Sequence, residues 1–311
     1  MTHSSSQRLH DWLHDKRHRT FSRAQKLLLL FGTVIAFWTA WVSQRLFNPR
    51  PVTGFSASIL QQPSAVRSVI AVSAAAFAAC ILTMLLGRKV RPDAGLFCAA
   101  VGLLYFRFQG SATRHALFHA GSAEGYLWLA LELALLGIVL FLAFLLLNHL
   151  VSIGVLADDA AADGATVEVE KLDQKLLCTA TVAVVTTAGM MIFCQTDRPG
   201  QTIWSVFLAA FLATWCAFRF IPVVPSAWYW TGPILAGAIG YLYTWKFGAQ
   251  NAAIGEPAGM FAALARPMPL DYASVGVAGS LMGYWIARRQ HRERQEEADA
   301  AAAAGTHEAA G

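Results

Sequence analysis

The sequence predicts an all-α polytopic membrane protein: a bundle of about eight transmembrane helices, with both termini in the cytoplasm and short interfacial helices on the external face. Of its 311 residues, 56% are hydrophobic and only 14% are charged, whereas soluble domains carry about 25% charged residues. The charges are missing from long continuous blocks, which is the pattern of membrane-spanning helices. Lys and Arg are also distributed unequally between the connections, and this inequality indicates the orientation.

Eight apolar blocks account for the predicted spans. A helix needs about 20 residues to cross the hydrocarbon core, so the third and last blocks are short and the fourth is long enough to tilt. The blocks are Lys26–Val42, Val69–Leu86, Ala94–Phe108, Tyr126–Leu150, Leu176–Cys194, Thr202–Ile221, Trp228–Trp245 and Tyr272–Ala287.

The orientation follows from the basic residues that flank these blocks. An even number of spans places both termini on one side, and the positive-inside rule makes the side richer in Lys and Arg cytoplasmic. That side holds Arg8, Lys16, Arg17, Arg19, Arg23, Lys26, Arg88, Lys89, Arg91, Arg288, Arg289, Arg292 and Arg294. We therefore expect a multi-pass protein of the cell (inner or plasma) membrane, with the N-terminus and the C-terminus inside.

The net charge of +5 does not indicate nucleic acid as a partner, because the basic residues lie between and outside the apolar blocks. We expect the lipid bilayer as the principal partner, with anionic lipid at the N-terminal basic tail. Other membrane subunits are further expected partners.

Five segments describe the domain organisation. Residues 1–25 form a basic cytoplasmic tail, 26–156 a first four-span half and 176–288 a second one. Between the halves, residues 157–175 contain six acidic residues among alanines and predict a solvated acidic cytoplasmic linker. Residues 289–311 form a cytoplasmic low-complexity tail, and we expect the part after Gln295 to be frayed or disordered.

Short interfacial helices are predicted in three external loops, near Phe55–Leu60, Thr113–Ala120 and Pro257–Ala265. In the first and last of them, apolar residues at helical spacing are followed by a proline. Such runs are too short to span, so we expect them to lie in the membrane interface and to cap the bundle.

Small residues predict close helix packing in the last two blocks. Small side chains let two backbones approach, and in lipid this packing replaces the hydrophobic drive for association. The residues are Gly276, Gly279 and Gly283 in the eighth block, and Gly232, Ala236 and Gly240 in the seventh.

Glu132 is the acidic residue that lies well inside an apolar block. A carboxylate within the membrane is costly and indicates either a functional site or a structural ion pair. It could serve as a proton or cation relay, or it could hold the bundle together. Arg107 ends the preceding span on the same side, so we expect Glu132 to face protein with Arg107 as its partner.

His115 and His119 are four residues apart and would share one face of a helix. That spacing suits a metal ligand pair, but a site needs three or four ligands, and Glu124 is the only further candidate nearby. The pair is better explained by an interfacial helix with two partly exposed histidines. The five cysteines form no C-x-x-C pair, and the sequence predicts no cofactor and no catalytic residue.

Three classes of function are consistent with the sequence. A non-catalytic scaffold or accessory subunit of a larger complex is favoured by the long apolar spans and the small-residue faces. A transporter or channel for a small solute, or one coupled to protons or cations, would use Glu132. A membrane enzyme would place its site at the external interface, with residues scattered beyond any motif.

Overall fold

The computed structural model of the chain is all-helical in the part that it describes, which comprises residues 23–47, 60, 65–86, 92–109, 123–152, 171–196, 198–223, 226–248 and 262–309. The long helices are α2 (Arg23–Phe47), α3 (Ala65–Leu86), α4 (Pro92–Gln109), α6 (Ala123–Ser152), α7 (Leu172–Phe193), α8 (Pro199–Phe220), α9 (Ala227–Tyr243) and α12 (Val277–Ala309). Shorter elements are the π-helical turns η2 (Thr244–Gly248) and η4 (Tyr272–Gly276) and the short helices α10 (Ala262–Ala265) and α11 (Pro269–Asp271).

The predicted apolar blocks coincide with these long helices. η2 extends α9, and α11 and η4 lead directly into α12, so the seventh and eighth blocks each lie in one continuous helical segment. Cys194 and Ile221, the last residues of the fifth and sixth blocks, follow α7 and α8 as their C-caps. By length and composition, five of the described helices can cross a membrane: α2, α3, α6, α7 and α8.

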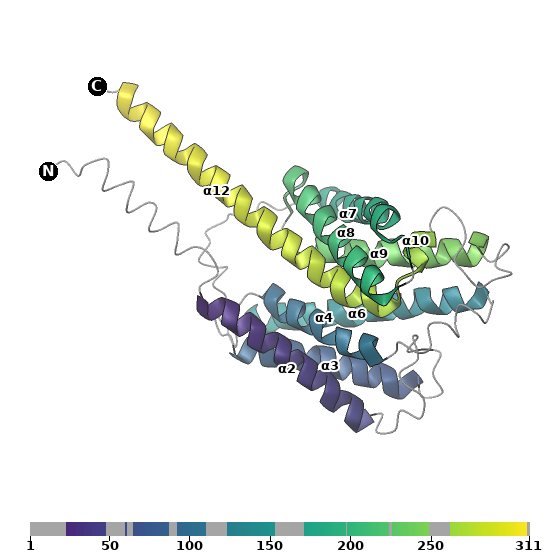
Figure 1. Cartoon of the computed structure of the whole chain (residues 1–311). Helices are drawn as coiled ribbons and strands as arrows, with labels where there is room; N and C mark the ends of the chain where they lie inside the picture. The colour runs from purple at the N-terminus through teal and green to yellow at the C-terminus, as the bar shows by residue number, and fades with distance from the viewer. Residues whose placement is uncertain are drawn as a thin grey trace.

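The helices form two groups with α6 between them. α2, α3 and α4 contact one another, and α8 lies between α7 and α12, while α7 also contacts α9. α6 contacts α9 of the second group as well as α3 and α4 of the first. Figure 1 shows α2 and α3 on one side of the molecule and α7 and α8 on the other.

Two segment boundaries and the conformation of the C-terminal tail differ from the predicted ones. α2 begins at Arg23, inside the predicted tail, and α7 begins at Leu172, inside the predicted acidic linker. The prediction of a frayed C-terminal tail is wrong, because α12 continues as a helix to Ala309. Alanine is the best helix former, and residues 300–304 are all alanine, so this run favours a helix even in water.

One predicted interfacial helix falls partly within the described residues. α10 covers the end of the Pro257–Ala265 run, and its Leu264 and Ala265 are fully buried. α10 therefore packs into the end of the bundle rather than lying on its surface. Residues 55–59 and 113–120, with His115 and His119, lie outside the described residues, as do most of the N-terminal tail and the acidic linker.

Candidate functional site

The two ends of the bundle differ in chemistry. At one end, called the ion-pair end, α4 finishes beside α11, where Arg107 and Asp271 meet. At the other, called the arm end, α8 finishes beside the outer part of α12: the indole N–H of Trp215 donates to the amide oxygen of Gln290 at 3.0 Å. The outer part of α12 leaves the bundle at the arm end (Figure 1).

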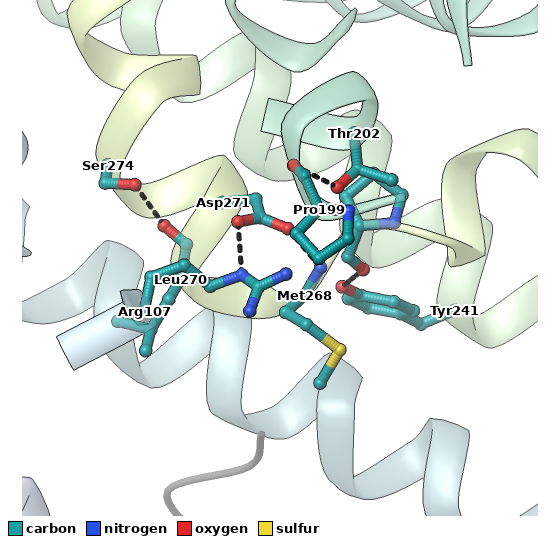
Figure 2. Close-up of polar contacts among 9 residues, drawn as sticks. Arg107, Pro199, Thr202, Tyr241, Met268, Leu270, Asp271 and Ser274 are labelled. Carbon is teal, nitrogen blue, oxygen red and sulfur yellow. Dashed lines mark hydrogen bonds and ion pairs between the residues drawn. The ribbon is translucent and has the colours of Figure 1, made fainter. Parts of the chain in front are cut away.

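Arg107 and Asp271 form a buried ion pair between the first and second halves of the chain. Arg107 Nε donates to Asp271 Oδ1 at 2.7 Å, and the two side chains are 3% and 0% exposed. The second carboxylate oxygen, Oδ2, accepts the backbone N–H of Met268 at 2.8 Å. Figure 2 shows the guanidinium reaching the carboxylate from α4. Hydrogen bonds to both carboxylate oxygens offset part of the cost of removing this charge from water.

The local sequence explains why Asp271 lies here. Pro269 occupies the first turn of α11, where its missing N–H removes no helical hydrogen bond. Asp271 is the third residue of that turn, and its side chain reaches back to the N–H of Met268, the N-cap residue. This is the acidic half of a capping box. The same carboxylate therefore starts a helix and neutralises an arginine on another helix.

Two buried tyrosines hold the segment that precedes Asp271. The hydroxyl of Tyr241 donates to the carbonyl of Pro267 at 2.5 Å, and the hydroxyl of Tyr272 donates to the carbonyl of Leu264 at 2.8 Å. Their rings are perpendicular, with centroids 6.2 Å apart. Gly237 makes room for Tyr272, because a Cβ at Gly237 would lie 2.6 Å from a ring carbon of that tyrosine. The two hydroxyls therefore fix the chain that carries the carboxylate.

Glu132 faces protein, as predicted, since it is 1% exposed. Its Oε2 accepts the backbone N–H of Leu60 at 3.3 Å. The predicted pairing of Glu132 with Arg107 is wrong, because the ion pair of Arg107 runs to Asp271. Glu132 nevertheless lies near the same region, because its neighbour Leu133 and Tyr272 both lie against Gly237.

The glycine face of α12 lies directly against the backbone of α8. A Cβ at Gly279 would lie 2.5 Å from the carbonyl oxygen of Phe207, and one at Gly283 would overlap the carbonyl oxygen of Phe211. A Cβ at Gly276 would lie 3.2 Å from a methyl group of Val206. The glycines therefore allow the closest approach between these two helices, and they run from the ion-pair end toward the arm end.

The small residues of α9 contact two other elements. A Cβ at Gly232 would lie 2.5 Å from a methyl group of Val182 on α7, and Gly240 lies against Leu264 of α10. Ala236, between them, is fully buried. This face therefore packs α9 against α7 and α10.

The weak metal candidates are not brought together in the part of the chain that the structure describes. Glu124 is exposed in the first turn of α6. Among the described residues no three His, Cys, Asp or Glu side chains gather in a way that could hold a metal ion. The glutamate therefore has no described partner for metal binding.

Asp271 is the functional candidate that the sequence reading missed. It lies one residue before the eighth apolar block, in the run Pro267-Met-Pro-Leu-Asp271, and so resembled a loop residue. The signal that could have found it is the acid at the third helical position after a proline. Nothing local in the sequence could have indicated that it meets Arg107, which is 164 residues away.

A groove between α6 and α9 faces outward from the bundle. It has a volume of about 300 Å³ and is lined by Ala134, Gly137, Ile138, Phe141, Leu142, Trp230, Thr231 and Ile234. Its walls are almost entirely apolar, as expected on a surface in contact with hydrocarbon. The groove therefore extends the apolar surface of α6 and adds no polar chemistry to the ion-pair end.

These three charged side chains inside the bundle thus bind other parts of the same chain. Arg107 and Asp271 form an ion pair, and Glu132 accepts a hydrogen bond from a backbone N–H. Such a network can lock helices together, and a buried carboxylate can also exchange a proton. Comparison with protein-family models, with curated proteins and with solved structures found no match to this chain.

Proposed function

We propose that the chain is an eight-span membrane protein with both termini in the cytoplasm, acting as a non-catalytic scaffold or accessory subunit of a larger membrane complex. Three further helical segments, α4, α9 with η2, and α11 to α12, lie in one bundle with the five apolar helices. α4 has 18 residues and extends about 27 Å at 1.5 Å per residue, close to the ~30 Å of the hydrocarbon core. α2 begins and α12 ends on the same side of the bundle (Figure 1).

Reporter fusions test this topology. A fusion within residues 157–170 and another after Gly311 should both report a cytoplasmic location, since the Lys and Arg residues concentrate on that side. A fusion between α2 and α3 should report the external side and serves as the internal control. An external signal from either of the first two fusions contradicts the eight-span arrangement.

The observation that carries the scaffold proposal is the length of α12. It continues as one helix to Ala309, well past Ala287, which is the last buried apolar residue among its described side chains. Trp215 and Phe218 of α8 still contact Gln290 and His291. The outer part of the helix runs clear of the others (Figure 1), and the 18 residues from Arg292 to Ala309 extend about 27 Å. A rigid helix fixed in the bundle presents a surface at a defined distance from the membrane.

The charges of this arm favour projection away from the bilayer. Arg288, Arg289, Arg292 and Arg294 lie nearest the membrane, whereas Glu296, Glu297 and Asp299 lie beyond them. Basic residues are attracted to the anionic cytoplasmic surface, and acidic residues are repelled by it. The order of charges therefore supports an arm that points into the cytoplasm, where a partner subunit can bind it.

The buried ion pair supports the same function from inside the bundle. A scaffold needs a rigid body, and Arg107–Asp271 ties α4 to the start of the segment that becomes α12. Breaking a buried pair costs several kcal/mol, about 3–5 in measured cases. The pair therefore fixes, at the opposite end of the bundle, the start of the helical segment that continues into the arm.

Changes confined to the arm test the scaffold proposal. In native membranes solubilised in mild detergent, the full-length chain should migrate in a complex larger than the single subunit. A chain ending at Gln295, and the helix-breaking variant Ala301→Pro, should migrate as the free subunit. Ala301→Gln, which keeps the helix, is the matched control and should stay in the complex.

All these variants should unfold at the same temperature as the full-length chain, because none touches the bundle. Migration of the full-length chain as the free subunit would contradict the proposal. An unchanged complex after truncation would contradict it equally.

A second candidate function, a proton- or cation-coupled transporter, is favoured by Glu132. The residue is buried within α6, about 14 Å from the start of that helix at 1.5 Å per residue. In proteoliposomes, Glu132→Gln should abolish a proton- or cation-dependent flux shown by the wild type and leave thermal stability nearly intact. Glu124→Gln, which changes an exposed carboxylate on the same helix, is the control. Equal fluxes for all three proteins would exclude this role.

A further inference from the structure

Basic side chains from three different helices gather at the arm end. They come from the start of α7, the end of α8 and the first turns of α12 beyond the bundle. The residues are Lys171, Lys175, Arg219, Arg288, Arg289 and Arg292, and together they are called the basic collar.

Contacts inside the bundle place the parts of the collar at one level. The Phe218 ring lies 6.0 Å from the ring of His291, which brings Arg219 of α8 to the level of Arg292 on α12. On α7, Cys178 belongs to the same buried cluster as Phe218 and Tyr284. Lys175 and Lys171 lie one and two turns further out than Cys178. The collar therefore belongs to one end of the second half and not to separate surfaces.

The charge of the collar is positive even with its acidic neighbours included. Asp173 lies on α7 at this level, and Glu293 accepts a hydrogen bond from Arg289 Nε at 2.9 Å. These two acids are fewer than the six basic residues of the collar. Arg289 stays 58% exposed despite its pair, and Lys171 and Arg219 are exposed as well, so all three can reach a ligand from outside.

Exposed apolar side chains adjoin the basic collar. Leu172 and Leu176 of α7 are 62% and 54% exposed, and Phe220 of α8 is 78% exposed. Leu176 continues into the apolar surface of α7, which is long and apolar enough to span the membrane. The surface thus offers cations at the level of a lipid headgroup and hydrocarbon contacts next to them.

We propose that the basic collar binds the headgroups of anionic phospholipids, whose acyl chains then lie along α7 and α8. The complementarity is between phosphate or glycerol-phosphate anions and side chains of Lys and Arg, with Arg able to bind two phosphate oxygens at once. The proposal does not depend on the scaffold function. It requires that the second half lies in a bilayer with the arm end at one surface.

The test uses purified full-length protein in detergent, titrated with phosphatidylglycerol or with phosphatidylcholine, with bound lipid measured by native mass spectrometry. The collar variant is Lys171→Gln, Arg219→Gln and Arg289→Gln combined. The matched control is Arg45→Gln, Arg67→Gln and Arg198→Gln combined. Those three arginines are also exposed, but they lie at the opposite end, in the last turn of α2, in the first turn of α3 and at the N-cap of α8.

The wild type should bind phosphatidylglycerol more tightly than phosphatidylcholine. The collar variant should lose about fivefold in affinity for phosphatidylglycerol per residue replaced, which corresponds to ~1 kcal/mol for each Lys or Arg at an anionic surface. The control variant should keep the wild-type preference. Thermal unfolding in phosphatidylcholine, expected to be the same for all three proteins, shows that each remains folded.

Three outcomes overturn the proposal. The first is equal affinity of the wild type for the two lipids, and the second is an equal loss in the collar and control variants. The third comes from a competition with inorganic phosphate at millimolar concentration. Full displacement of the lipid would show that the collar is a site for free phosphate, whereas retention of the lipid supports recognition of the whole lipid.

Discussion

Arginine has opposite roles at the two ends of this bundle. At the ion-pair end, Arg107 is 3% exposed and has one carboxylate partner on a distant part of the chain. At the arm end, Arg289 is 58% exposed and pairs with Glu293 one turn along the same helix. The surroundings of a charge, more than its residue type, therefore decide whether it stabilises the fold or remains available for a ligand.

The physical reason is the strength of charge interactions in the two surroundings. Two charges 4 Å apart interact by about 1 kcal/mol in water and by about 4 kcal/mol at an effective dielectric constant of 20. Removing a charge from water also costs several kcal/mol, so a buried charge that loses its partner destabilises the fold. An exposed charge loses little, because water replaces the partner.

The largest expected effect is at the ion-pair end. Asp271→Ala leaves the Arg107 guanidinium buried without its counter-charge and removes the acceptor for the Met268 N–H. We expect a loss of about 3–5 kcal/mol in the free energy of unfolding, measured by titration with sodium dodecyl sulfate in mixed micelles.

The double variant Arg107→Met with Asp271→Ala distinguishes the cost of an unpaired buried charge from the cost of the lost side-chain contacts. It should cost less than Asp271→Ala alone, because no orphan charge remains; the lost helix cap still costs about 1 kcal/mol. If the double variant is the less stable of the two, the ion pair is not the reason that Asp271 matters.

An intermediate effect is expected on the glycine face that joins the two ends. A Cβ at Gly279 would lie 2.5 Å from the backbone oxygen of Phe207, whereas one at Gly200 would have nothing within 4 Å. Gly279→Ala should destabilise the protein by about 1–3 kcal/mol through overpacking. Gly200→Ala should instead stabilise by up to ~1 kcal/mol, because alanine is the better helix former. The same titration measures both free energies of unfolding. A Gly279→Ala variant that is as stable as the wild type or more stable would show that α8 moves aside without cost.

The smallest effect is expected at the arm end. Arg289→Ala removes the exposed pair with Glu293, and we expect a change below about 0.5 kcal/mol in the free energy of unfolding. Raising the salt concentration should reduce even this difference, because exposed charges are screened. A loss comparable to that of Asp271→Ala would erase the distinction between the two ends.

The helices could be predicted from the sequence because their signal is local and repeated. Every long apolar block is a helix, since a segment without charges has no other way to satisfy its backbone in lipid. The outer part of α12 was misjudged for a related reason. Its alanine run has the low complexity typical of a disordered tail, although alanine favours a helix without any tertiary contact.

The site could be predicted only in part, because it depends on contacts between distant segments. Glu132 and Arg107 were identified because each is a charge in or beside an apolar block, and both are buried. Their partners depend on which helices are neighbours, and no local pattern reports that. Asp271 was missed because the two prolines before it resemble a loop, whereas in three dimensions they begin a helix.

The π-helical turn Tyr272–Gly276 has a consequence for how the length of this chain can vary. A π-turn holds one residue more than an α-helix needs, and each residue rotates a helix by about 100°. A single deletion within this turn can therefore be absorbed by its conversion to an α-helix, whereas a single deletion between Gly276 and Gly279 would rotate Gly279 and Gly283 by that angle relative to Asp271. Either the carboxylate would leave Arg107 or the glycines would leave α8. The alanine run at 300–304 has no such constraint, so insertions and deletions should leave the fold of the bundle intact there and disrupt it between Gly276 and Gly279.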